Sequence, residues 1–360
     1  MFVKIYRALH LKPLFYLFVI LFMIIMIIAP VLTRVLERVG YEGLARMMAY
    51  VGYTWMALLF IFFTLHILFD FFRAIIALGG WIFKKDLAFI VHTHRIIFLA
   101  AFSISVSVIA YGYYEAGHIK VERMVIFTDK LSRDAGNIKI VQISDLHIGI
   151  IVKNNRVKRV VDIIKKEDPD LLVSTGDLID GKLHKQKNQG NGFKDIKPKL
   201  GKFAVLGNHE FYAGIKDSLE SLEKEGFVIL RGKAITLDGT INIAGIDDPA
   251  GKPFNYVEVD ESHLLKGLPR DLFTILLKHQ PIVDHNALKY FDLQLSGHTH
   301  GGQIFPFRYI TKIFYTYPSG LVSLAKDKFL YTSRGTGTWG PPIRFLSPPE
   351  ITIIEIKNRG

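Results

Sequence analysis

Three apolar runs in the first third of the chain constrain its fold more than any other feature. They lie at residues 14–32, 47–69 and 96–114, and none contains a charged residue. A transmembrane helix needs about 20 such residues, so residues 1–115 are predicted to form an all-α transmembrane region with about three helices. A chain of this kind is expected in the cell (inner) membrane as a multi-pass protein.

Two other structures could account for long apolar runs. A cleaved signal peptide is disfavoured because the first run is too long and no small-residue cleavage site precedes Arg34. A buried helical domain of a soluble protein would not need three uncharged runs of this length. Residues 71–83 are apolar but short and carry Arg73, so an interfacial or re-entrant helix is expected there. His92 and His94 fit interfacial residues better than metal ligands.

The charges of the chain favour a membrane partner but do not orient it. The positive-inside rule compares the numbers of basic residues on the two sides of the membrane. Each side would receive seven, so the rule does not decide which side of the membrane holds the rest of the chain. The net charge of +12 is spread along the chain, as suits an anionic membrane surface, and forms no basic stripe that would indicate nucleic acid. The chain has no cysteine, which excludes thiolate metal sites and a cysteine nucleophile.

From about residue 120, short β-rich runs alternate with polar helical stretches. This alternation predicts an α/β domain with layered, mixed sheets at residues 137–360, preceded by a linker at 116–136. The predicted strands include residues 138–144, 171–174, 203–206, 273–277 and 293–295, and the clearest helix is 154–167.

Candidate metal ligands follow many of the predicted strands. In chain order they are Asp145, His147, Asp177, Asn208, His279, His298 and His300. The carboxyl ends of parallel strands meet at one edge of an open sheet, which is where such folds place their sites. A lone aspartate after a strand is usually a turn former, but a series of carboxylates and imidazoles at successive strand ends predicts a metal site.

The order of these residues resembles that of a known family. Asp-x-His, Gly-Asp, Gly-Asn-His-Glu, His and Gly-His-x-His follow one another as in the calcineurin-like metallophosphoesterase superfamily, over about residues 138–356. The strings at 297–303, 333–337 and 349–351 resemble a membrane-associated bacterial branch of it. The resemblance implies a layered α/β/β/α sandwich of mixed sheets that binds two divalent cations. Ligands of nitrogen and oxygen without thiolate suit Mn, Fe or Zn.

The resemblance also implies a role for each residue. The first metal would be held by Asp145, His147 and His300, and the second by Asn208, His279 and His298, with Asp177 as the bridge. A water between two such cations loses a proton near neutral pH and can attack phosphorus. His209 would act as general acid toward the leaving alkoxide. Asp145 is a candidate to orient His209, and Glu210 is expected to be structural.

These features predict a membrane-anchored, binuclear-metal phosphoesterase that hydrolyses a phosphodiester or a pyrophosphate. One alternative is the UDP-2,3-diacylglucosamine pyrophosphatase of lipid A synthesis. An alternative of another class is an inactive, membrane-tethered metal-binding scaffold, which would be expected to lack at least one ligand. The expected partners are the lipid bilayer and a phosphorylated substrate, with a lipid substrate as one option.

Three features near the site each allow two interpretations. The lysine-rich loop at 181–199 is either a solvated loop or a surface that attracts anionic headgroups. The aromatic run at 305–321 either packs over the core or enters the membrane interface. Arg334 and Arg344 either contact phosphate or form salt bridges.

Overall fold

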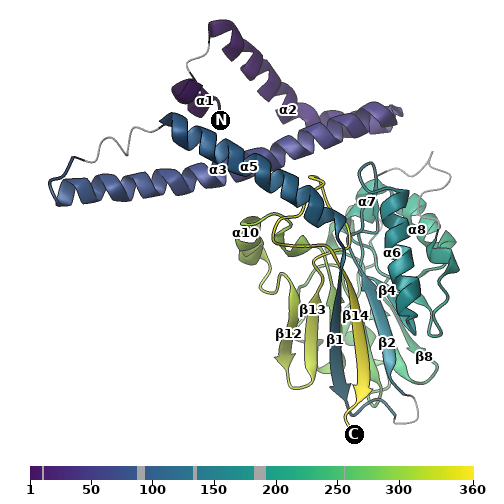
Figure 1. The fold of residues 1–360 in the computed structure, drawn as a ribbon. Coiled ribbons are helices and arrows are strands. Elements are labelled where there is room, and N and C mark those ends of the chain that lie inside the picture. The colour runs from purple at the N-terminus through teal and green to yellow at the C-terminus, as the bar shows by residue number, and fades with distance from the viewer. Residues whose placement is uncertain (10–11, 87–93, 133–135, 182–191, 255) are drawn as a thin grey trace. The chain divides into compact units, whose positions relative to one another are not determined.

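The computed structural model describes residues 1–9, 12–86, 94–132, 136–181, 192–254 and 256–360. The chain divides into two compact units, which are described separately (Figure 1). The first unit comprises residues 1–114 with 340–343, and the second comprises residues 115–339 with 344–360. The described part of the first unit is built on helices, and the strands belong to the second.

Among the described residues of the first unit, three helices are long and apolar enough to cross a membrane. Its helices are α1 (Phe2–Leu9), α2 (Pro13–Val39), α3 (Glu42–Ile82) and α5 (His94–Gly117), of which α2, α3 and α5 are the long ones. Small residues let α2 and α3 approach closely: a Cβ on Gly52 would lie 2.5 Å from the Cβ of Ala29. Close contact through small side chains is the usual way in which membrane helices pack.

Residues 71–83, for which an interfacial or re-entrant helix was expected, form no helix of their own but continue α3. The 41 residues of α3 run without interruption to Ile82, because the segment contains no proline and its paired glycines, Gly79 and Gly80, come only in the last turn. At 1.5 Å per residue, α3 is about 60 Å long, about twice the thickness of a hydrocarbon core. His94 begins α5 and lies 3.4 Å from the guanidinium of Arg73, whereas His92 lies outside the described residues.

The second unit is built around two six-stranded mixed sheets and a small pair, β3 (Ile148–Gly149) with β5 (Ile179–Asp180). In sheet order, the first sheet contains β1 (Lys120–Thr128), β14 (Glu350–Asn358), β2 (Ile138–Ile143), β4 (Leu171–Ser174), β6 (Lys202–Ala204) and β7 (Val228–Ile229). The second contains β12 (Gly320–Ala325), β13 (Lys328–Thr332), β11 (Leu293–Ser296), β10 (Phe273–Leu277), β9 (Ile241–Gly245) and β8 (Lys233–Leu237). The helices are α6 (Asn154–Glu167), α7 (Asn208–Ala213), α8 (Ile215–Lys224), α9 (Glu261–Lys266) and α10 (Phe307–Phe314).

The two sheets pack face to face and helices cover their outer faces, which confirms the predicted layered α/β/β/α fold. Alternate residues of each strand point to opposite faces, so Ile140 lies in the core between the sheets while Val141 packs toward α6. The apolar face of α6 is buried as its spacing predicts, through Val157, Val160, Val161 and Ile164. On the outer face of the second sheet, Leu276 packs with Leu265 of α9.

The residues interpreted as a linker, 116–136, contain a strand of the first sheet. β1 pairs in parallel with β14, with Lys120 opposite Glu350 and Thr128 opposite Asn358. The linker assignment is therefore wrong for this segment. Apolar residues occur on both faces of β1, since Val121, Val125 and Phe127 occupy exposed positions. The sequence therefore lacks the alternation of apolar and polar residues that marks a half-buried strand.

Candidate metal centre

The candidate ligands lie at the carboxyl ends of neighbouring parallel strands. β2, β4 and β6 are parallel neighbours in the first sheet, as are β10 and β11 in the second. The turns that follow these strands are tight: Asp145, His147, Asp177, His298 and His300 all have left-handed backbone conformations, with φ between 51° and 72°. Left-handed backbone is unfavourable for side chains other than glycine and often marks functional sites.

Two glycines allow these turns to approach one another. A Cβ on Gly297 would lie 1.9 Å from the hydroxyl oxygen of Ser144, and a Cβ on Gly207 would lie 2.2 Å from the Oδ1 of Asp177. Both distances are far below van der Waals contact, so any larger residue would force the ligand-bearing turns apart.

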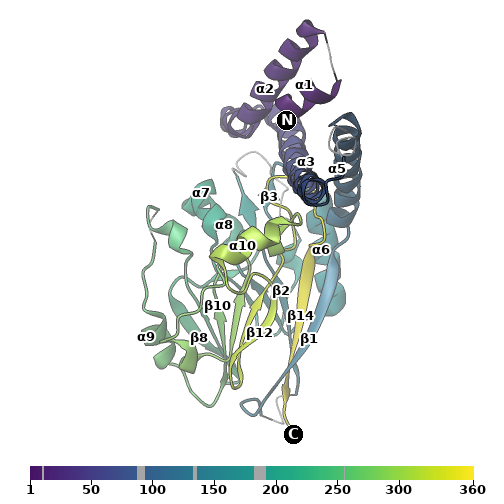
Figure 2. The ribbon, with the colours of Figure 1, turned by 90° about the vertical axis from the view of Figure 1, so that its left-hand side faces the viewer.

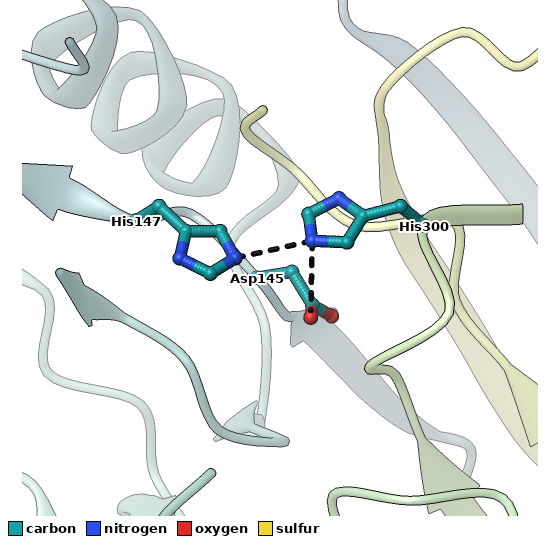
Figure 3. A group of neighbouring side chains, drawn as sticks. All are labelled: Asp145, His147 and His300. Carbon is teal, nitrogen blue, oxygen red and sulfur yellow. Dashed lines mark hydrogen bonds and ion pairs between the residues drawn. The ribbon is translucent and has the colours of Figure 1, made fainter. Parts of the chain in front are cut away.

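The first group of side chains consists of Asp145, His147 and His300 (Figure 3). The Nε2 atoms of His147 and His300 lie 3.1 Å apart, and the Nε2 of His300 lies 3.6 Å from the Oδ1 of Asp145. Asp145 is held in place by the hydroxyl of Ser144 and by the backbone N–H of His298, which donates over 3.0 Å. Nitrogen and oxygen donors thus converge from turns that follow two different sheets.

The second group consists of Asp177, His279 and His298, joined by Asn208. The Nδ1 of His298 lies 3.1 Å from both the Nε2 of His279 and the Oδ1 of Asn208. The Nδ1 of His279 donates to the carbonyl of Thr175 over 2.8 Å, so in the neutral ring its Nε2 carries a lone pair that faces the other donors.

The carboxylate of Asp177 lies between the two groups. Its Oδ2 is 3.3 Å from the Nε2 of His279 and 3.8 Å from the Nε2 of His147. Its Oδ1 accepts the backbone N–H of His209 over 2.9 Å. One carboxylate that faces both groups is the arrangement required of a ligand shared by two cations.

Burial favours the neutral imidazole at His147 and His298, whereas at His279 the carboxylate of Asp177 outweighs burial and raises the pKa. Burial, aided by neighbouring His209, lowers the pKa of His147 to about 3, and burial, aided by His279, lowers that of His298 to about 3. Burial raises the pKa of Asp145 to about 6. The Nδ1 of His147 is buried without a hydrogen-bond partner. Buried nitrogen and oxygen donors that converge in this way fit divalent cations.

Comparison with known proteins places this centre in a family. The sequence profile of the calcineurin-like phosphoesterases matches residues 138–302. A metallophosphoesterase of Aquifex aeolicus (strain VF5) is 43% identical over 253 residues, which cover 70% of this chain and 97% of that protein. The chain belongs to the calcineurin-like metallophosphoesterases.

Two other relatives extend the comparison. A metallophosphoesterase of Campylobacter jejuni is 33% identical over 325 residues, which cover 86% of this chain and 84% of that protein. A transmembrane protein with a metallophosphoesterase domain from Danio rerio is 31% identical over 251 residues, which cover 66% of this chain and 57% of that protein. With the three long apolar helices, the Danio rerio relative indicates that this calcineurin-like metallophosphoesterase is associated with a membrane.

His209 lies beside the metallophosphoesterase centre and is oriented by a carboxylate that the sequence analysis missed. Its ring contacts that of His147 at 4.6 Å between centroids, and its Nδ1 lies 3.0 Å from the Oδ1 of Asp180. Burial opposes the charged imidazole, but the carboxylates of Asp177 and Asp180 outweigh burial and raise the pKa of His209. The suggestion that Asp145 orients His209 is wrong. The signal for Asp180 was a second carboxylate three residues after Asp177.

Glu210 connects two ligand-bearing turns of the metallophosphoesterase domain. Its buried carboxylate accepts the backbone N–H groups of Asp177, Ile179 and Gly207 over 2.9, 2.9 and 2.8 Å. Burial, and then the neighbouring Asp177, raise the pKa of Glu210 to about 7. Its contacts are with the backbone, as expected of a structural residue.

The two arginines expected near phosphate have separate roles. Arg334 forms ion pairs with Glu122 and Glu350. Arg344 is fully buried, and its guanidinium donates to several backbone carbonyls and, over 2.9 Å, to the Nδ1 of His300. Neither predicted role fits Arg344, which instead fixes the His300 turn. Because Nδ1 accepts this bond, the proton of the neutral ring lies on Nε2, where a metal would displace it.

Two further segments of the sequence each allowed two interpretations. Residues 182–191 of the lysine-rich loop lie outside the described residues, and its remaining lysines, Lys194, Lys197 and Lys199, are exposed. In the aromatic run, α10 does not pack its apolar side chains over the core, because Tyr309 and Phe314 are exposed. Of the two interpretations of this run, packing over the core is therefore wrong for α10.

Proposed function

We propose that this chain is a membrane-anchored phosphoesterase that uses two divalent cations to hydrolyse a phosphodiester or a pyrophosphate. The observation that carries the proposal is the position of Asp177. Its carboxylate faces His147 of one ligand group and His279 of the other, and it accepts the backbone N–H of His209. The membership in the metallophosphoesterase family supports the same chemistry.

Seven side chains would hold the two cations. They are Asp145, His147 and His300 for the first, Asn208, His279 and His298 for the second, and Asp177 for both. When bound, two cations lower the pKa of a water and neutralise charge on phosphoryl oxygens in the transition state. The nitrogen and oxygen donors suit Mn, Fe or Zn.

His209 would supply the proton for the leaving group. A general acid must carry its proton at the working pH, and the raised pKa of His209 favours the imidazolium. Asp180 accepts from Nδ1 over 3.0 Å, so the ring is oriented through that nitrogen and Nε2 remains for the substrate. In this arrangement Asp180 positions the acid without touching the reacting atoms.

The alternative of an inactive scaffold predicts a missing or displaced ligand. All seven ligand positions carry suitable side chains and the structure gathers them at one edge of the two sheets, so we favour an enzyme. UDP-2,3-diacylglucosamine is a second candidate substrate. The same centre would cleave its pyrophosphate bond, and the helices of the chain that suit a membrane fit a lipid substrate. We place the protein in the cell (inner) membrane as a multi-pass protein.

Hydrolysis of a substrate panel by the full chain in detergent, supplied with Mn²⁺, tests the proposal. The panel is a bis-aryl phosphodiester, an aryl phosphomonoester and UDP-2,3-diacylglucosamine. Asp177→Ala should abolish turnover. His209→Ala should lower it by about 10²–10⁴-fold, with the larger losses on substrates whose leaving groups are poor. Asp195→Ala and His263→Ala, at exposed positions, serve as matched controls.

Two results would contradict the proposal. Turnover that survives both chelation of metals and the Asp177 substitution would exclude a metal-dependent reaction. Equal loss of activity on good and poor leaving groups in the His209 variant would exclude its role as a general acid.

A further inference from the structure

The apolar face of α10 points outward. A helix on a protein surface normally turns its apolar face to the core and its polar face to water. In α10 the buried side chain is Thr311, whereas Ile313 is 77% exposed and Phe314 is 75% exposed. Tyr309 and Ile310 are exposed as well, so α10 does not turn its apolar face to the core as a surface helix usually does.

Basic residues flank this apolar face. Arg308 and Lys312 are four residues apart, so they share one side of the helix, and both are exposed. α10 contains no acidic residue. An exposed apolar stripe bordered by cations is the composition of helices that lie in the interface of anionic membranes.

The segment that carries α10 is bonded to the metal-binding turn. Before the helix, the backbone at Gly302 packs against Arg308, where a Cβ would lie 2.4 Å from the Cα of that residue. After it, the ring of Tyr315 contacts that of His298 at 5.2 Å between centroids. The hydroxyl of Thr299, which separates the two histidines of the turn, donates to the carbonyl of Pro318. Any external surface that α10 contacts is therefore held close to the metal centre.

A second exposed aromatic residue lies at the same centre. Trp339 is 52% exposed, and its ring lies 5.9 Å from that of His209. Its backbone N–H and C=O both bond to the side chain of Gln303, which precedes α10 by four residues. Tryptophan prefers the interface between membrane and water. α10 lies at the end of the domain that also carries α7 and β3, beyond the sheets (Figure 2).

We propose that the apolar face of α10 docks on the surface of a bilayer that contains anionic lipids, and so brings the metal centre to substrates at that surface. The bilayer is the occupant that the chain itself favours, because three of its helices are long and apolar enough to span one and Arg308 and Lys312 complement its charge. The docking is independent of which phosphate ester is cleaved.

Spin labelling tests this directly, because the chain has no cysteine and an introduced one is unique. Ile313→Cys in the full chain is labelled and reconstituted in bilayers of phosphatidylcholine with phosphatidylglycerol. The accessibility of the label to oxygen, which partitions into lipid, is compared with its accessibility to a water-soluble nickel chelate. Lys216→Cys, at an exposed position of α8, is the control for water, and Phe18→Cys, exposed on α2, is the control for lipid.

Docking predicts that the label at residue 313 resembles that at residue 18, with oxygen favoured several-fold over nickel relative to residue 216. The preference should weaken in bilayers without phosphatidylglycerol and in the Arg308→Gln, Lys312→Gln background. A label that nickel reaches as freely as at residue 216 would refute the proposal. A label that neither reagent reaches would also refute it, because another part of the protein would then cover α10. None of these readouts depends on turnover, so the proposed activity can fail or succeed separately.

Discussion

Replacement of Glu210 provides a quantitative test of how the metal centre is held together. The carboxylate accepts three buried backbone N–H groups, two on the Asp177 turn and one on the Gly207 turn. Each donor left without a partner costs about 1–3 kcal/mol, so Glu210→Ala is expected to cost about 3–9 kcal/mol. A typical domain has a stability of roughly 5–15 kcal/mol, and the two turns should therefore open readily.

Glu210→Gln separates hydrogen bonding from charge. The amide oxygen can still accept from two donors, while the NH₂ group would face the third and lose that bond. Because burial already raises the pKa of Glu210 to about 7, the neutral amide sacrifices little favourable charge. The expected cost is about 1–3 kcal/mol, from one unmet donor.

Hydrogen exchange measured by mass spectrometry on the full chain in detergent is the suitable assay. Peptides that contain Asp177, Ile179 and Gly207 should exchange much faster in Glu210→Ala, and moderately faster in Glu210→Gln. Glu220→Ala, at an exposed position of α8, should change exchange very little. The reasoning is refuted if the alanine variant protects these peptides as well as Glu220→Ala does, or if alanine and glutamine have equal effects.

Three further predictions concern the residues around the centre. Asp180→Asn removes a charge that raises the pKa of His209. Because a general acid loses its proton as pH rises through its pKa, the activity of this variant should begin to fall at a lower alkaline pH than that of the wild type. An alkaline limb of the pH–activity profile that does not move would contradict this. Asp177→Ala should lower the metal content of the purified chain, by elemental analysis, and weaken metal affinity more than the ~10–100-fold typical of losing an outer hydrogen-bond partner; an unchanged content would exclude a bridging ligand. Arg344→Lys should lower the melting temperature, because a lysine cannot replace the five N–H groups of a guanidinium and each buried carbonyl left unmet costs about 1–3 kcal/mol, whereas Arg123→Lys at an exposed position should melt like the wild type.

The sequence predicted the mixed α/β domain and the candidate ligands from local patterns, while the family resemblance implied the layered sandwich and the grouping of the ligands. The apolar spacing of α6 and the runs at β2 and β4 are readable within a few residues of chain. The glycines at 207 and 297 mark turns at the strand ends, and parallel strands bring these turns together. The structure then gathers the candidate ligands into two groups, Asp145 with His147 and His300, and Asp177 with Asn208, His279 and His298.

The features that the sequence analysis missed depend on contacts between distant segments. β1 is a strand because β14 pairs with it, more than 200 residues later in the chain, and its own polarity pattern gives no sign of this. Arg344 looks like a candidate for a surface salt bridge, but its surroundings are carbonyl groups of turns that only the fold assembles. Asp180 was within reach of the analysis, since its spacing from Asp177 could have been read as a second functional carboxylate.

The left-handed backbone of five ligand residues implies that metal binding and backbone relaxation compete at the same positions. Such a conformation costs an ordinary side chain about 1–2 kcal/mol, and glycine would remove that cost while deleting the ligand. In a saturation scan, glycine should therefore give stable but inactive variants at residues 147 and 298, whereas at residues 145 and 177 it would also leave a buried backbone N–H group without its acceptor. A search for stable variants that does not assay function would therefore select proteins that fold well but have lost metal ligands.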